Sequence, residues 1–162
     1  MPGRVSHLFA AGRGFVKEPA EALRVDTGGA RGDRHHGRDP ARALLLVPEA
    51  CYVALRSEGF ELTAGRLGEN VVAYGMTMAP PAGTWVTLGP VRTVVASACT
   101  VCQALAAVDP ALPKAAYGRR GVYLRVARGG MVRRGDLVTW TLPQVVPAPA
   151  GAARPETEKE TR

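Results

Sequence analysis

Hydrophobic residues occur along this chain mostly in short runs, each bounded by glycine, proline or charged residues. Short apolar runs rich in β-branched residues are typical of strands rather than helices. They predict strands at Arg4–Phe9, Glu21–Val25, Ala43–Val47 and Asn70–Ala73. The run Ala43–Val47 is predicted to be a buried strand.

Two longer segments have the pattern of β-hairpins. The first extends from Trp85 to Ala96 and turns at Gly89-Pro90. The second covers Gly121–Leu142, with Arg128-Gly129-Gly130 as its turn. The chain also holds 19 glycines and 13 prolines, which fits many tight turns. The predicted fold class is therefore mainly β, with a few short helices.

Helical signals are confined to two short segments. Pro48 suits the first turn of a helix that runs to about Ser57 and stops at Gly59. In that helix Cys51 lies one turn before Leu55, which predicts a thiol packed in the core. A second short helix is predicted after Thr100, which is a plausible N-cap.

The composition changes at Pro143, after which little apolar content remains. We predict a domain at 1–142 and a disordered tail rich in Pro, Ala and charged residues at 143–162. The cysteines Cys51, Cys99 and Cys102 are odd in number and do not suggest a disulfide framework. No apolar run approaches the length of a membrane span. These features predict a cytoplasmic protein with no membrane contact.

The chain has a net charge of +7, and most of its cations are arginines. The planar arginine side chain suits bidentate recognition of phosphate or carboxylate. A high-GC genome would also enrich arginine, so only its clustering beside glycines indicates function. A nucleic-acid partner is not expected, because aromatic residues make up only 6% and no nucleic-acid motif is present.

Cys102 is the residue most indicative of chemistry. On the first turn of a helix, its sulfur would lie near unpaired backbone N–H groups, which lower a thiol pKa and favour the thiolate. The thiolate would serve as a nucleophile or a soft metal ligand. Three alternatives remain open: an inert buried cysteine, a redox dithiol with Cys99, and a zinc site with Cys99, His35 and His36. Adjacent histidines in an extended segment point apart, which counts against zinc.

Three further segments carry polar side chains beside glycines. The loop Gly32–Gly37 holds Asp33, Arg34, His35 and His36, a density typical of a functional loop. The alternative is a simple turn in which Asp33 accepts bonds from local backbone N–H groups.

Glu69 and Asn70 follow Gly68, where they either cap the backbone or contact a polar heterocycle. Arg119 and Arg120, between Gly118 and Gly121, form a basic turn that is either a phosphate site or a solvated loop.

Taken in order, these segments resemble the MOSC family, named for the C-terminal domain of molybdenum cofactor sulfurase. The resemblance covers about Arg4 to Trp140. Its segments are GDRHHG with Arg42 downstream, Gly65–Gly75, Pro81–Gly89, the cysteine before a short helix, and Gly121–Val138. Many members have Arg-x-Pro-Cys at the thiol, whereas this chain has Cys99-Thr-Val-Cys102, which leaves room for Cys99 to partner Cys102.

The resemblance implies a barrel-like β fold that binds a molybdopterin-type molybdenum cofactor or carries activated sulfur on Cys102. Cys102 would be the molybdenum ligand or persulfide thiol, with Asp33 and His35 as further catalytic residues. The expected cofactor-binding residues are Arg34, His36, Arg42, Glu69, Asn70, Arg119 and Arg120.

The chain resembles the small stand-alone type, with no PLP domain of its own. Reduction of N-hydroxylated substrates is the redox activity that the family suggests. The alternative is a non-catalytic carrier that delivers sulfur or pterin cofactor to a partner enzyme. The expected partners are the pterin cofactor or a small-molecule substrate, and a sulfur-donor or acceptor protein.

Overall fold

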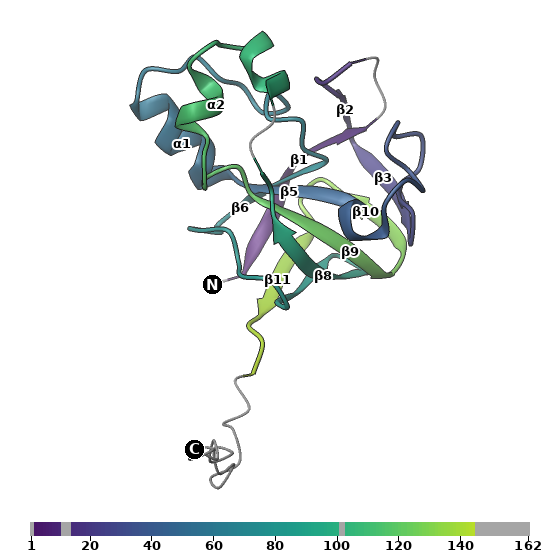
Figure 1. The fold of residues 1–162 in the computed structure, drawn as a ribbon. Helices are drawn as coiled ribbons and strands as arrows, with labels where there is room; N and C mark the ends of the chain where they lie inside the picture. The colour runs from purple at the N-terminus through teal and green to yellow at the C-terminus, as the bar shows by residue number, and fades with distance from the viewer. Residues whose placement is uncertain (1, 11–13, 101–102, 145–162) are drawn as a thin grey trace, which may run out of the picture.

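A closed seven-strand β-barrel forms the centre of the computed structural model, which describes residues 2–10, 14–100 and 103–144 (Figure 1). Around the barrel the strands follow the order β11, β7, β8, β9, β5, β6, β1, and β1 closes on β11. The barrel strands are β1 (Gly3–Ala10), β5 (Leu44–Pro48), β6 (Val71–Tyr74), β7 (Trp85–Leu88), β8 (Val91–Ala98), β9 (Val122–Arg128) and β11 (Leu137–Thr141). The predicted barrel-like, mainly β fold is confirmed.

The remaining strands lie outside this ring. β2 (Glu18–Ala20) pairs with the end of β1, and β3 (Ala22–Asp26) forms a small sheet with β4 (Gly29–Ala30) and β10 (Gly130–Arg133). The sequence analysis predicted β3 but not β2, which has only three residues.

The helical elements are short. The α-helices are α1 (Glu49–Ser57) and α2 (Leu112–Ala115), and the 3-10 helices are η1 (Pro40–Arg42) and η2 (Gln103–Ala107). Figure 1 shows α1 and α2 gathered on one side of the barrel. No helix in the described ranges is long and apolar enough to cross a membrane.

Strand β5 is buried, as predicted, and the structure shows that it is buried on both faces. Leu44 and Leu46 belong to the core cluster with the barrel interior, whereas Leu45 and Val47 belong to a second cluster with α1 and α2. Successive strand residues point to opposite faces, so this one run of side chains serves both cores. The second core fixes the helical layer, and with it the loops above β5.

The hairpin predicted at Gly121–Leu142 is wrong in its pairing. β9 pairs with β8 and β5, β10 pairs with β3, and β11 pairs with β7 and β1. The backbone at Gly129 runs against β3, where a Cβ atom would lie 2.3 Å from the Val25 carbonyl oxygen. The turn at Gly129 therefore directs the chain toward β3 instead of folding it back on β9. The hairpin of β7 and β8 is confirmed.

The helix predicted after Thr100 is a five-residue 3-10 helix, η2, in the described part of that segment. Pro110 follows closely and lacks the N–H that another helical turn needs. A short 3-10 helix has a smaller dipole than an α-helix of several turns. Cys102 itself lies outside the described residues, as does the tail from 145 onward.

Candidate functional site

A cavity of about 520 Å³ lies beside β5, and we call it the cation cavity. Its walls come from the loops after β1 and β4, the turn before β6 and the segments flanking η2 and β9. Its lining residues are Phe15, Lys17, Arg34, His35, Arg38, Asp39, Arg42, Leu45, Gly68, Asn70, Thr100, Ala104, Arg120 and Tyr123. Lysine and arginine far outnumber carboxylates in this lining, so the cavity favours an anionic ligand.

Arg120 is the most deeply buried arginine of the cavity, with only 4% of its surface exposed. Its guanidinium donates hydrogen bonds to the Leu67 carbonyl oxygen from Nε (3.0 Å) and Nη2 (2.8 Å), and Nη1 donates to the Thr100 carbonyl at 2.9 Å. The ring of Phe15 lies 5.3 Å from the guanidinium carbon. Within the described ranges no carboxylate pairs with this buried cation. An anion in the cavity would supply the missing charge.

The neighbouring residue Arg119 faces away from the cavity. Its guanidinium forms an exposed ion pair with Glu58, just after α1. The difference follows from the backbone at Gly121, which has a φ of +98° and runs so close to β5 that a Cβ atom would lie 2.2 Å from the Leu46 carbonyl. Arg119 is therefore not among the residues that the structure brings to the cavity.

Lys17, which lines the cavity, forms a buried ion pair with Asp33, which is not among the lining residues. Lys17 Nζ lies 2.9 Å from Asp33 Oδ2, and the two side chains are 5% and 3% exposed. Burial alone would raise the pKa of Asp33, but the bonds from Lys17 and from the His35 backbone N–H outweigh it and hold this pKa below its ordinary value. Burial lowers the pKa of Lys17, against the opposing effect of Asp33.

Asn70 connects the ion pair of Lys17 and Asp33 to the barrel through hydrogen bonds. Its side-chain amide donates to Asp33 Oδ2 at 3.0 Å and to the Phe9 carbonyl at 3.1 Å, while its oxygen accepts from the Leu45 N–H at 3.1 Å. One side chain thus links β1, β5 and the loop that carries the arginines. Asn70 also lines the cavity, so capping and ligand contact, the two roles that the sequence left open, are compatible here.

Glu69 points the other way and is fully buried. Its carboxyl group accepts hydrogen bonds from the Tyr52 hydroxyl, the Gly65 N–H (2.8 Å) and the Leu67 N–H (3.2 Å). Burial raises the pKa of Glu69 despite these donors. Glu69 stabilises the turn that contains Leu67, whose carbonyl oxygen accepts hydrogen bonds from Arg120. Glu69 itself is not among the residues that line the cavity.

His35 lines the cavity, and its ring accepts a hydrogen bond from Arg34. Arg34 Nε donates to His35 Nε2 at 3.1 Å, which assigns the proton of the neutral ring to Nδ1. Burial and the charges of Lys17 and Arg34 lower the pKa of His35. The imidazole is therefore neutral at neutral pH, with a single N–H hydrogen-bond donor at Nδ1.

His36 is directed to a different neighbour. Its Nε2 lies 2.7 Å from Asp26 Oδ1, at the base of the same loop but outside the cavity lining. His35 and His36 thus diverge, as expected for adjacent residues. Across the described residues no group of three His, Cys, Asp or Glu side chains could hold a metal ion. The zinc and dithiol alternatives both include Cys102, which lies outside those residues.

Arg42 and Arg38 complete the cationic wall. The 3-10 helix η1 carries Arg42, whose guanidinium lies 4.9 Å from the centre of the Tyr123 ring. The Asp39 side chain caps η1 by accepting from the Ala41 N–H. Burial, followed by contact with Cys99, raises the pKa of Tyr123 to about 12. Its hydroxyl is therefore a neutral donor near the arginines.

The sequence analysis missed Lys17, Phe15, Arg38 and Tyr123 as cavity residues. One signal for Lys17 was present, because it is one of only three lysines in an arginine-rich chain. Phe15 carried no such signal. It is held in place by Gly68, where a Cβ atom would lie 2.8 Å from the phenyl ring.

Cys51 is buried in the second core, as predicted, and burial raises its pKa to about 11. We expect this thiol to resist iodoacetamide at pH 7.5 in the folded protein and to react once urea unfolds the chain. A Cys51→Ser variant should lose about 1–2 kcal/mol in the free energy of unfolding, because it buries a hydroxyl group in an apolar site. Mass spectrometry of the labelled peptides and urea titration measure the two effects. Rapid labelling of the native protein would contradict the assignment.

A barrel with a cation-lined cavity at one side defines the class of protein, and comparison with known proteins defines the family. The family model of the MOSC domain matches residues 32–139. The chain belongs to the MOSC domain family, whose members are linked to the molybdenum cofactor. No curated protein sequence matches this chain.

Several solved structures share the fold. The YuaD protein from Bacillus subtilis has a TM-score of 0.77 and 24% identity, over 89% of this chain and 98% of that one. YiiM from Geobacillus stearothermophilus has a TM-score of 0.72 and 24% identity, over 86% and 75%. YiiM from Escherichia coli has a TM-score of 0.68 and 20% identity, over 87% and 71%. At these identities the likeness extends to the fold alone.

Proposed function

We propose that this protein binds a pterin-type molybdenum cofactor in the cation cavity and uses Cys102 as the molybdenum ligand or as a persulfide-carrying thiol. Arg120 carries the proposal, because it is a buried cation at the cavity with no carboxylate partner in the described residues. Such a cation needs an anion, and a pterin cofactor ends in a phosphate.

The residues present fit this cofactor. Arg34, Arg42 and Arg120 would hold the phosphate, with Lys17 and Arg38 adding positive charge to the same cavity. Asn70 and the Tyr123 hydroxyl would offer hydrogen bonds to the heterocycle. When bound, the cofactor would supply two-electron redox chemistry. Cys102 is assigned by its place in the family pattern and by the affinity of thiolates for soft metals.

His35 would hold a proton at Nδ1 beside the bound substrate. In the redox role, two electrons and two protons convert an N–OH group to N–H and release water, with an external electron donor. Asp33 fixes the His35 backbone through its 2.8 Å bond to the N–H. Arg34 keeps the imidazole neutral and oriented. His35 would donate a hydrogen bond from Nδ1 to the substrate without changing its own charge, and the two protons would come from solvent.

The experiment that tests this proposal is metal and pterin analysis of freshly purified protein, together with its intact mass. Stoichiometric molybdenum and pterin support the ligand role. An added mass of about 32 Da, one sulfur atom, supports the persulfide role. Cofactor bound in stoichiometric amount, with no turnover of N-hydroxylated substrates, supports the alternative of a carrier protein. Protein that takes up neither cofactor nor sulfur when both are supplied contradicts the proposal.

Replacement of the thiol provides a specific prediction. Cys102→Ser should abolish both the added sulfur and any metal-linked activity, because a hydroxyl group is neither a soft ligand nor a sulfur carrier. The fold should be unchanged by circular dichroism. Cys51→Ser is the matched control and should retain full sulfur loading. If Cys51→Ser loses the sulfur instead, the reactive thiol has been misassigned.

A further inference from the structure

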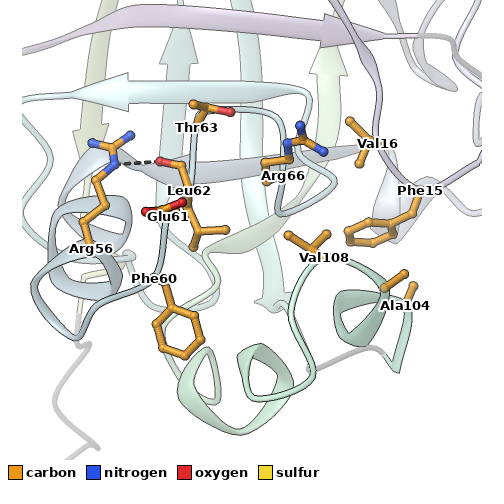
Figure 2. Close-up of a pocket in the computed structure, with 11 residues that line it drawn as sticks. Phe15, Val16, Arg56, Phe60, Glu61, Leu62, Thr63, Arg66, Ala104 and Val108 are labelled. Atoms are coloured by element: carbon orange, nitrogen blue, oxygen red, sulfur yellow. Dashed lines mark hydrogen bonds between the residues drawn. The ribbon is translucent and has the colours of Figure 1, made fainter.

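A second hollow adjoins the cation cavity, and we call it the aromatic groove. It is an open groove of about 950 Å³ between α1 and η2, and Figure 2 shows the side chains along it. Most of its wall is apolar, and it includes two phenyl rings, Phe15 and Phe60. The proposed cofactor function does not use this groove.

The two hollows meet at two residues. Phe15 and Ala104 line both of them, so the aromatic groove opens beside the cation cavity without another layer of side chains between them. Phe15 separates the two hollows, and its ring is held in place because it packs against the Arg120 guanidinium and closely over Gly68. A molecule lying in the groove would therefore end at the edge of the proposed cofactor site.

Charge is unevenly distributed along the groove. Arg66 lines the groove together with Val16 and Val108, and Figure 2 draws all three toward the Phe15 end. Arg66 is exposed, and within the described ranges no carboxylate lies within ion-pair distance of it.

At the far end of the groove, Arg56 already has partners within the protein. Its Nε donates to the Leu62 carbonyl at 2.7 Å, and its guanidinium lies 5.5 Å from the centre of the Tyr52 ring. The carboxylate of the groove, Glu61, is drawn on this side and away from Arg66. Arg66, which has no carboxylate partner in the described ranges, and the apolar walls thus lie together at the Phe15 end.

We propose that the aromatic groove binds an aromatic molecule that carries one carboxylate, with its ring against Phe15 and Val108 and its carboxylate on Arg66. A phenyl ring offers its edge or face to an aromatic ligand, and a guanidinium binds a carboxylate through two parallel hydrogen bonds. The inference rests on the proposed function in one respect, that such a ligand would be the substrate class presented to the cofactor.

The test measures binding of 3-phenylpropanoate to the full-length, cofactor-free protein by isothermal titration calorimetry. Its uncharged analogue, 3-phenylpropanamide, has the same ring and chain. We expect the acid to bind about tenfold more tightly than the amide, since the charged hydrogen bonds to Arg66 distinguish them. Arg66→Gln should remove this preference, whereas Arg24→Gln, an exposed arginine on β3, should keep it. Equal affinity for acid and amide, or equal effects of the two variants, would overturn the proposal.

A second pair of variants tests where the carboxylate binds, without touching the core. Val16 lies in the groove and Val53 lies on α1 outside it, and both are exposed. Val16→Glu places a negative charge next to Arg66 and should weaken binding of the acid about tenfold, whereas Val53→Glu should not. If both variants lose binding of the acid, or if both keep it, the groove is not the binding site.

Competition separates this inference from the proposed function. Saturating inorganic pyrophosphate, which the cation cavity should take, is expected to leave the affinity for 3-phenylpropanoate unchanged. Displacement of the acid by pyrophosphate would place it in the cation cavity and overturn the groove assignment. Protein that binds the acid in the groove but takes up no molybdenum or pterin would instead refute the cofactor proposal alone.

Discussion

Arg120→Ala should lower the affinity of this protein for inorganic pyrophosphate at least about tenfold and abolish retention of the cofactor. Among the described residues that line the cation cavity, Arg120 is the one buried arginine, and a charge-assisted hydrogen bond is stronger there than at the surface. Its removal also leaves the Leu67 and Thr100 carbonyls without their donor. We expect the free energy of unfolding to fall by about 2–4 kcal/mol as a result.

Two variants separate binding from folding in this experiment. Arg119→Ala removes an adjacent arginine that pairs with Glu58 outside the cavity, and it should leave pyrophosphate binding unchanged. Arg120→Lys keeps one positive charge but loses the planar fork, so it should retain the fold better than it retains binding. Urea unfolding and calorimetry measure the two quantities. Equal loss of pyrophosphate affinity in Arg119→Ala and Arg120→Ala would show that the effect is general electrostatics.

The contrast between these arginines shows where sequence reasoning reaches its limit. Both stand between Gly118 and Gly121, and the sequence gives them equal claim to a phosphate. The direction of each side chain depends on how closely the backbone at Gly121 approaches β5, which is a contact between segments some 75 residues apart. Local pattern does not carry such information.

The strands were predictable for the opposite reason. The run at β5 and the hairpin of β7 and β8 depend on neighbouring residues, through apolar periodicity and the turn at Gly89-Pro90. The pairing of β10 with β3 depends on a distant partner, and the prediction failed there. The loop Gly32–Gly37 was singled out by its density of polar residues, and it brings Arg34 and His35 to the cavity. Lys17 was missed because its burial requires Asp33, which lies on a separate loop.

Asp33→Asn should be the most destabilising single change in the buried pair beside the cavity. It leaves Lys17 as a buried cation without its carboxylate, and breaking a buried ion pair in this way costs about 3–5 kcal/mol. Removing both charges, in Lys17→Met with Asp33→Asn, should recover much of that loss, because no unpaired charge remains. Glu21→Gln is the control. Glu21 pairs with Arg134 at the surface, where its side chain is 85% exposed, and its loss should have little effect on unfolding.

The pH dependence of the stability difference between wild type and Asp33→Asn identifies the interaction of Lys17 with Asp33 as ionic. The pKa of Asp33 is held below its ordinary value in the folded protein, so its carboxylate stabilises the fold above about pH 4, and that stability is lost as the pH falls through the folded pKa. The gap between wild type and Asp33→Asn should therefore be wide at pH 7 and close in acid. Without Asp33, which opposes the effect of burial, the pKa of Lys17 should fall further, so the gap should also narrow as rising pH discharges Lys17. Urea unfolding at a series of pH values measures this gap, and a gap independent of pH would mean that Lys17 and Asp33 stabilise the site by packing rather than by charge.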